Sequence, residues 1–222
     1  MSQSRLARVL EPEGMESAEE VAAYDAMDHV GVNARFVEDF LLTGAELTAV
    51  ADLGTGTALI PLELFAANPD ACITAVDLAP AMLAAADRNI ARAEAAHAIT
   101  TLLGDAKRTP LPDASQRAVI SNSLVHHLRE ATPFLADAAR LLAPGGVLFV
   151  RDLFRPEDDE AVARLSALHT ERATPRQRAL FEASLRAALT LDEIRASAAE
   201  AGLAGATVEQ TSDRHWTLVW RR

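Results

Sequence analysis

The sequence predicts an α/β protein with a seven-stranded, mostly parallel sheet and helices on both faces. Short apolar runs suited to buried strands alternate with segments whose apolar residues recur at helical spacing. The first of these strands leads directly into a glycine turn and a helix. The last two expected strands, 207–210 and 215–220, follow one another and should pair antiparallel.

Composition limits the classes of function. A chain of 222 residues is expected to form a single domain, 1–222. A net charge of −11 argues against a nucleic-acid binder, because phosphate contacts need clustered Lys and Arg. The single cysteine, Cys72, permits no intrachain disulfide and is expected in the core. No apolar run approaches the ~18 residues of a membrane span, so we expect a cytoplasmic protein without membrane partners.

Residues 1–46 are expected to form an N-terminal helical cap. One helix should cover about 18–29, where a Ser17/Glu20 pair suggests a capping box. Gly31 should separate it from a second amphipathic helix ending near Gly44. Polar side chains gather around this boundary; they either form a solvated face or contact a cofactor or substrate. The candidates for that contact are Tyr24, His29 and Asn33.

Residues 47–155 are expected to form a ligand-binding core that begins with a strand over 49–53. Gly54 and Gly56 permit positive φ and close approach of a ligand to the backbone. The helix that follows directs its free N–H groups at this turn. Leu59 stands where the nicotinamide fingerprint Gly-x-Gly-x-x-Gly needs its third glycine, which disfavours a dinucleotide.

The second strand, about 71–76, ends at Asp77, and Pro80 should begin the next helix. In nucleotide-binding α/β folds an acid at this place bonds ribose hydroxyls; the alternative is a strand-end acid without a ligand. The third strand, 99–103, is followed by Gly104 and Asp105.

The fourth strand, about 117–121, leads into the run from Asn122 to Leu128. A histidine titrates near neutral pH and could accept a proton from a substrate. His126 and His127 are therefore the candidate catalytic residues, although adjacent side chains on a helical turn should diverge, which leaves one of them structural. For the same reason we expect no metal site.

These motifs together resemble the class I S-adenosylmethionine-dependent methyltransferases, in particular small-molecule enzymes of the methyltransferase type 11, 12 and 25 groups. The resemblance rests on Asp-x-Gly-x-Gly-Thr from Asp52, on Asp77, on Asn-x-Leu-x-His-His-Leu from Asn122, and on Leu-Leu-Ala-Pro-Gly-Gly over 141–146. It implies a Rossmann-like fold, S-adenosyl-L-methionine as cofactor and S-adenosyl-L-homocysteine as product. The Asn/Asp-Pro-Pro-aromatic run of amino-group DNA methyltransferases is replaced here, which disfavours that subclass.

The resemblance also implies roles for individual residues in cofactor binding. Asp52 would help to hold the amino-acid end, and the glycine turn would approach the methionine and ribose. Leu78 and Met82 would border the adenosine, Asp105 would reach the adenine amino group, and the backbone of Ala106 would contact the ring. The full set of expected cofactor residues is Asp52, Gly54, Thr55, Gly56, Asp77, Leu78, Met82, Asp105, Ala106, Asn122 and Leu124.

After a helix over 134–142, a sharp turn and a strand over 147–150, residues 156–189 are expected to form a helical insertion near the mouth of the site. Its arginines are either solvated or a landing surface for an anionic substrate; they are Arg164, Arg172, Arg176, Arg178 and Arg186. Residues 190–222 should supply a C-terminal helix, capped by a Thr190/Glu193 box, and the strand pair. Trp216 and Trp220 share a strand face, which suggests burial in the core or in a homodimer.

The sequence thus predicts a methyltransferase (EC 2.1.1.-) of bacterial type that acts on a small molecule and leaves the acceptor atom, O, N, S or C, open. Two alternatives belong to other classes. One is a nucleotide-dependent oxidoreductase, and the other is a non-catalytic protein that uses the same fold for binding.

Overall fold

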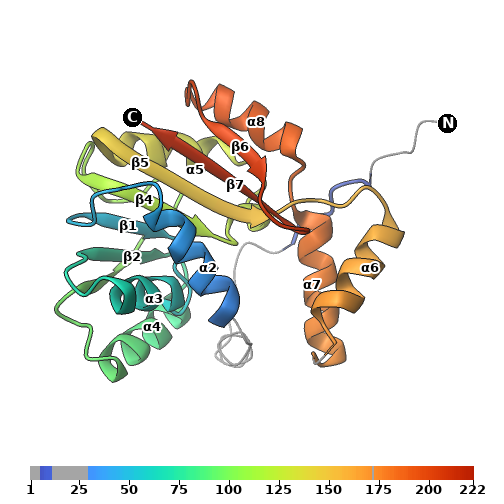
Figure 1. The fold of residues 1–222 in the computed structure, drawn as a ribbon, viewed down its shortest axis with the longest axis horizontal. Coiled ribbons are helices and arrows are strands. Elements are labelled where there is room, and N and C mark those ends of the chain that lie inside the picture. The colour runs from blue at the N-terminus through green and yellow to red at the C-terminus, as the bar shows by residue number, and fades with distance from the viewer. Residues whose placement is uncertain (1–5, 12–29, 172) are drawn as a thin grey trace.

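The computed structural model describes residues 6–11, 30–171 and 173–222. Its centre is a seven-stranded sheet in the order β3-β2-β1-β4-β5-β7-β6 (Figure 1). The strands are β1 Val50–Leu53, β2 Ile73–Asp77, β3 Ile99–Leu103, β4 Gln116–Asn122, β5 Leu142–Leu153, β6 Thr207–Gln210 and β7 His215–Arg221. Neighbours among β1–β5 are parallel, whereas β7 is antiparallel to both β5 and β6. The predicted α/β fold class is confirmed.

The strand order determines where a ligand can bind. From β1 the chain proceeds to β2 and β3 on one side, then returns to place β4 and β5 on the other. Open α/β sheets bind ligands at this reversal, outside the carboxyl ends of the strands. The ends of β1, β2 and β4 therefore define the candidate site.

Helices cover both faces of the sheet (Figure 1). The described helices are α2 Val30–Leu41, α3 Leu59–Ala67, α4 Pro80–Arg92, α5 Thr132–Leu141, α6 Asp159–His169, α7 Pro175–Ala187 and α8 Leu191–Glu200, with a 3₁₀ turn, η1, at Val125–His127; α6 and α7 lie away from the sheet faces (Figure 1). Side chains of α2, α3 and α4 share one apolar core with the sheet. Side chains of α5 and α8 share the other, which contains the fully buried Trp216. Trp216 thus belongs to the core of the domain and needs no dimer interface to explain it.

Aromatic packing fixes α2 against the sheet. The Phe36 ring meets the Phe149 ring edge-on with centroids 5.0 Å apart, and Phe40 lies 5.7 Å from the same ring. Gly31, expected to interrupt the helix, instead lies within α2. It occupies the first turn, where backbone N–H groups have no helical partner in any case. The expected helix over 18–29, with Tyr24 and His29, lies outside the described residues.

Two strand predictions needed correction. β2 begins at Ile73, so Cys72 precedes the strand and is exposed rather than in the core. β5 begins at Leu142, which pairs with Gln116 of β4, and the residues after it, predicted as a sharp turn, bond to the chain end. The Gly145 N–H donates to the Arg222 carbonyl at 2.9 Å, and the Arg222 N–H donates to the Gly146 carbonyl at 3.0 Å. Gly145 takes φ +81° there, a conformation that glycine adopts readily.

The predicted insertion consists of α6 and α7, which pack as a pair beside the carboxyl end of β5 (Figure 1). α7 also packs against η1. Capping boxes begin α7, at Thr174 and Gln177, and α8, at Thr190 and Glu193 as predicted. Two of the insertion's arginines form ion pairs within it, Arg164 with Glu160 and Arg186 with Asp159, which accords with the solvated-face interpretation for these two.

Residues 6–11, here called the N-terminal strap, are tied to the insertion and to η1. The Leu6 N–H donates to the Glu157 carbonyl and the Val9 N–H to the Arg186 carbonyl. The Arg8 guanidinium donates to four carbonyls, those of His126, Leu128, Arg129 and Ala187, at 2.6 to 3.3 Å. The strap therefore lies against η1 and the insertion. Among the described helices, none has the length and apolar character to cross a membrane.

Candidate functional site

The turn after β1 takes left-handed backbone conformations at alternate residues. Gly54 has φ +74°, Gly56 +57° and Ala58 +64°. The N–H groups of Gly54 and Thr55 both donate to the Val76 carbonyl at 2.9 Å, which binds the turn to β2. A Cβ at Gly54 would lie 2.8 Å from Cδ1 of Leu124. Glycine is thus required at 54 both for its φ and for the close packing of Leu124, which covers the turn.

Asp77 joins three elements at the carboxyl edge of the sheet. Its Oδ2 accepts from the Gly56 N–H at 2.8 Å and its Oδ1 from the Ala79 N–H at 2.9 Å, linking β2 to the glycine turn and to the start of α4. Each carboxylate oxygen keeps a further lone pair for a hydroxyl donor. Burial raises the pKa of Asp77, against the opposing effect of these backbone donors and of nearby His127.

Asp52, at the carboxyl end of β1, is buried without a partner. Residue 52 is 1% exposed, and neither of its carboxylate oxygens has a hydrogen-bond partner of good geometry. The neighbouring Thr55 and Thr57 hydroxyls are also buried and unpaired. Burial raises the pKa of Asp52 to about 7; the nearby Thr55 hydroxyl opposes this rise, and the negative charge of Asp77 adds to it. Unpaired buried polar groups are costly, so this cluster suits a ligand that brings hydrogen-bond donors and positive charge.

Apolar side chains line the ends of β2 and β3. Leu78, directly after β2, is 51% exposed, and Leu103, at the end of β3, is 56% exposed. The register pairs Asp77 with Leu103, so both leucines lie on neighbouring strand ends. Met82, predicted here, is buried on α4. Leu103 was missed from the sequence, where it appeared only as the last residue of a strand.

Asp105 and Ala106 follow β3 as predicted. Asp105 Oδ1 accepts from the backbone N–H of Lys107 at 2.8 Å and lies 3.2 Å from Lys107 Nζ. Ala106 is buried. At the end of β4, Asn122 Oδ1 is buried and unpaired. Ser123 then turns the chain with φ +58° and donates its N–H to the Arg151 carbonyl at 2.9 Å, which starts η1 at Val125.

The two candidate histidines have different environments. His126 is 4% exposed, with its Nδ1 2.6 Å from Asp152 Oδ1 and its backbone N–H donating to Asp152 Oδ2 at 3.1 Å. Burial lowers the pKa of His126, but the Asp152 carboxylate more than compensates, so the pKa lies above its ordinary value. Asp152, on β5, was not among the predicted site residues; its only sequence signal is its place near the end of a strand.

The side chain of His127 is 28% exposed, so it is the histidine that a small molecule could reach. Contrary to the expectation that the two side chains diverge, the rings of His126 and His127 lie together, with centroids 4.0 Å apart. His127 Nδ1 lies 3.3 Å from Oε2 of Glu11 in the N-terminal strap. Glu11 in turn accepts from the Ser184 hydroxyl of α7 at 3.2 and 3.3 Å. Glu11 was also missed from the sequence.

The predicted substrate or lid candidates are only partly described. Asn33 is buried in α2, whereas Tyr24 and His29 lie outside the described residues. The role of all three stays a prediction.

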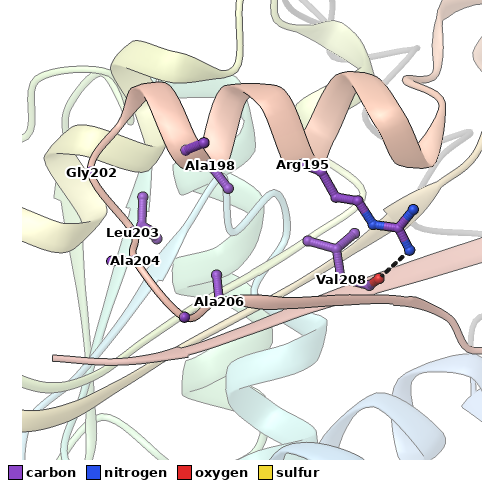
Figure 2. Close-up of a pocket in the computed structure, with 9 residues that line it drawn as sticks. Arg195, Ala198, Gly202, Leu203, Ala204, Ala206 and Val208 are labelled. Atoms are coloured by element: carbon purple, nitrogen blue, oxygen red, sulfur yellow. Dashed lines mark hydrogen bonds between the residues drawn. The ribbon is translucent and has the colours of Figure 1, made fainter.

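A separate hollow of about 350 Å³ lies between α8 and the start of β6 (Figure 2). Its lining is mostly alanine and glycine, and its one charged side chain, Arg195, donates to the Val208 carbonyl at 2.9 Å. Because β6 runs in the same direction as β5, its start lies at the sheet edge opposite the glycine turn. This hollow is distinct from the candidate site.

Comparison with known proteins agrees with this geometry. A protein family described as "Methyltransferase domain" matches residues 51–150. A malonyl-[acyl-carrier protein] O-methyltransferase of Geobacter sulfurreducens is 33% identical over 82% of this chain and 66% of its own length. The ubiquinone/menaquinone biosynthesis C-methyltransferase UbiE of Syntrophotalea carbinolica is 28% identical over 86% of this chain and 81% of its own.

A solved structure from Methanococcus maripaludis, described as a putative S-adenosyl-L-methionine-dependent methyltransferase, shares the fold with a TM-score of 0.75. It is 17% identical over 96% of each chain. The chain spans 66%, 27% and 51% of the length of three curated relatives that it matches.

Proposed function

Because the chain belongs to the class I S-adenosylmethionine-dependent methyltransferase family, we propose that it transfers the sulfonium methyl group of S-adenosyl-L-methionine to a small-molecule acceptor and releases S-adenosyl-L-homocysteine. The observation that carries the proposal is the unpaired, buried Asp52 beside the glycine turn. A positively charged amino group is the ligand feature that such a carboxylate would favour.

The residues present fit the cofactor along its length. Asp52 would take the amino end, the turn over Gly54–Gly56 would pass under the methionine and ribose, and Asp77 would accept the ribose hydroxyls. Leu78 and Met82, now joined by Leu103, would border the adenine, with Asp105 and Ala106 at its edge. Asn122 and Leu124 would lie on the side of the methyl group. When bound, the cofactor supplies a methyl group already activated by the positive sulfur.

The acceptor would bind over η1, between the cofactor and the N-terminal strap. His127 is partly exposed and lies near enough to Asp77 to oppose the rise in its pKa. An acceptor with an O–H or S–H group could lose its proton to His127. His126, buried against Asp152, would act as a positioning residue that supports the His127 ring. Holding two reactants in line can lower the activation barrier by roughly 7–11 kcal/mol. Positioning therefore supplies most of the rate enhancement, and a general base adds to it.

Several expectations from the sequence remain part of this proposal. They are a small molecule rather than nucleic acid as acceptor, a cytoplasmic location without membrane partners, a bacterial source and a homodimer. The names of the two curated relatives include an O-methyltransferase and a C-methyltransferase. They therefore do not select an acceptor atom for this chain.

The test measures methyl transfer from radiolabelled S-adenosylmethionine to a panel of hydroxy acids, phenols, thiols and amines. We expect turnover with at least one class, and at least a tenfold weaker apparent affinity for the cofactor in Asp77→Asn. Asp70→Asn, which changes an exposed acid, is the matched control and should behave as the wild type. Cofactor binding without transfer to any acceptor would favour the non-catalytic alternative, and hydride transfer with a nicotinamide cofactor would favour the oxidoreductase.

A further inference from the structure

We propose that Glu11, His126 and His127 bind one divalent metal ion of the zinc type. One potential ligand atom from each residue lies within 4.8 Å of those of the other two. The sequence predicted no metal site, because the two histidines were expected to diverge and the third ligand comes from the distant N-terminal strap. The binding itself is independent of the proposed methyl transfer, although its role in a reaction rests on that function.

The spacing of the ligands suits a tetrahedral ion. With metal–ligand bonds of about 2.0–2.2 Å, two ligands of a tetrahedral zinc lie about 3.4 Å apart. Glu11 Oε2 and His127 Nδ1 are already 3.3 Å apart. Pairs separated by up to 4.8 Å need to approach by at most roughly 1.4 Å to reach this tetrahedral spacing. Such a change is within reach of small side-chain rotations.

The chemistry of the donors favours the same type of metal. Two imidazoles and one carboxylate form the ligand set of catalytic zinc sites, which keep a fourth position for water or substrate. Calcium and magnesium prefer oxygen ligands alone. His127 Nδ1 is buried and lies 3.3 Å from Glu11 Oε2, without the alignment of a good hydrogen bond. Zinc coordination would satisfy this atom.

Partners behind the ligands hold them in place. Nδ1 of His126 forms a hydrogen bond with Asp152 Oδ1 at 2.6 Å, which leaves Nε2 available to a metal. A histidine fixed by a carboxylate in this way is the usual arrangement of metal ligands. Glu11 is held by the Ser184 hydroxyl, and Arg8 fastens the strap to the carbonyls around η1. Two of the three ligand side chains, His126 and Glu11, thus have hydrogen-bond partners behind them.

The simpler alternative is an ion pair between Glu11 and His127 that fastens the strap without a metal. An ion pair needs a protonated imidazole, whereas a metal needs a neutral one. Under the proposed function, a bound metal would replace His127 as the group that promotes loss of the acceptor's proton, because a ligated neutral imidazole has no lone pair left to accept it. The fourth position of the metal would face the acceptor and bind its oxygen or sulfur. The two alternatives therefore differ in whether the purified protein binds a metal at all.

The test titrates Zn²⁺ by calorimetry into the full chain, stripped with a chelator and free of S-adenosylmethionine. Glu11→Gln removes one ligand while keeping the size of the side chain, and His127→Gln removes another. His97→Gln is the matched control, because His97 is exposed and its Nδ1 faces the Glu94 carbonyl. We expect one ion per chain in the wild type and the control, and at least tenfold weaker binding in both ligand variants.

Cobalt provides a measurement on the wild type that does not depend on how the variants fold. Co²⁺ in a four-coordinate site gives intense visible absorption bands, and Zn²⁺ added afterwards should remove them. Weak six-coordinate bands, no saturable binding, or equal Zn²⁺ affinity in wild type and folded ligand variants would overturn the proposal. Loss of binding in His97→Gln alone would do so too, by assigning the ion to another site. The affinity of the wild type for S-adenosylmethionine is measured in a separate titration, so that failure of the proposed function can be told apart from failure of the metal site.

Discussion

Replacing Asp52 by asparagine should stabilise the protein without ligand at alkaline pH. The pKa of Asp52 is raised from 3.8 to about 7 by burial. At about 1.36 kcal/mol per pKa unit, ionised Asp52 costs the folded state ~4 kcal/mol above pH 7. Asparagine removes the charge but leaves an unpaired buried amide, which costs about 1–3 kcal/mol. We therefore expect a net gain of about 1–3 kcal/mol at pH 8.

The sign of the pH dependence follows from proton binding. Because the folded pKa exceeds the unfolded one, the folded state holds more protons between pH 3.8 and about 7. The free energy of unfolding therefore falls as pH rises through this window, and Asp52 accounts for a loss of about 2–3 kcal/mol between pH 5 and pH 8. Asp52→Asn should lack this part of the loss.

Urea unfolding at pH 5, 6, 7 and 8 measures the effect. The difference in unfolding free energy between Asp52→Asn and wild type should move in favour of the variant as pH rises. Asp70→Asn, at an exposed acid, should follow the wild type throughout. Parallel curves for Asp52→Asn and wild type would refute the reasoning, since they would mean that residue 52 does not titrate differently in the folded state.

Three further substitutions test the glycine turn and its partner acid. Gly54→Ala should lower the free energy of unfolding by about 1–3 kcal/mol in urea, because residue 54 has φ +74° and a Cβ would lie 2.8 Å from Leu124. Adding Leu124→Ala should recover part of this loss; no recovery would mean that backbone strain, and not the contact with Leu124, causes the loss. Ala58→Gly should stabilise by up to about 1 kcal/mol, because Ala58 is left-handed at φ +64°; a lower midpoint would contradict this. Asp77→Asn should weaken S-adenosylhomocysteine binding at least tenfold by calorimetry and also lower stability by about 1–3 kcal/mol, because Asp77 accepts two backbone N–H bonds; an unchanged affinity would remove the ribose assignment.

Much of the fold could be predicted from the sequence because its signals are local. β1 is buried throughout, which its short apolar run indicates, and the capping box at Thr190 determines where α8 begins. Asp77 was found because the length of one β-α-β unit brings it to the turn. Where a boundary depended on a distant segment, the prediction was wrong. The extension of β5 back to Leu142 involves Gln116 of β4, which pairs with Leu142, and Arg222, whose backbone bonds to Gly145 and Gly146.

The part of the site that the sequence missed depends on long-range contacts. His126 and Asp152 come from different strand ends, and Glu11 reaches His127 only because Arg8 and the backbone of the strap bind the insertion and η1. No local pattern marks such pairs. The pairing of the histidine rings likewise follows from the 3₁₀ turn after Ser123 and not from the spacing of the residues.

The central claim is that the site at the ends of β1, β2 and β4 binds S-adenosylmethionine. Thermal unfolding of the wild type in the presence of S-adenosylmethionine, S-adenosylhomocysteine, NAD or NADP tests it most directly. A ligand that binds only the folded state adds about 2.7 kcal/mol to the free energy of unfolding at a hundredfold excess over its dissociation constant. We predict that the melting temperature rises with the two adenosyl-sulfur compounds and does not change with the dinucleotides. A rise with NAD or NADP, or no rise with any of the four compounds, would contradict the claim.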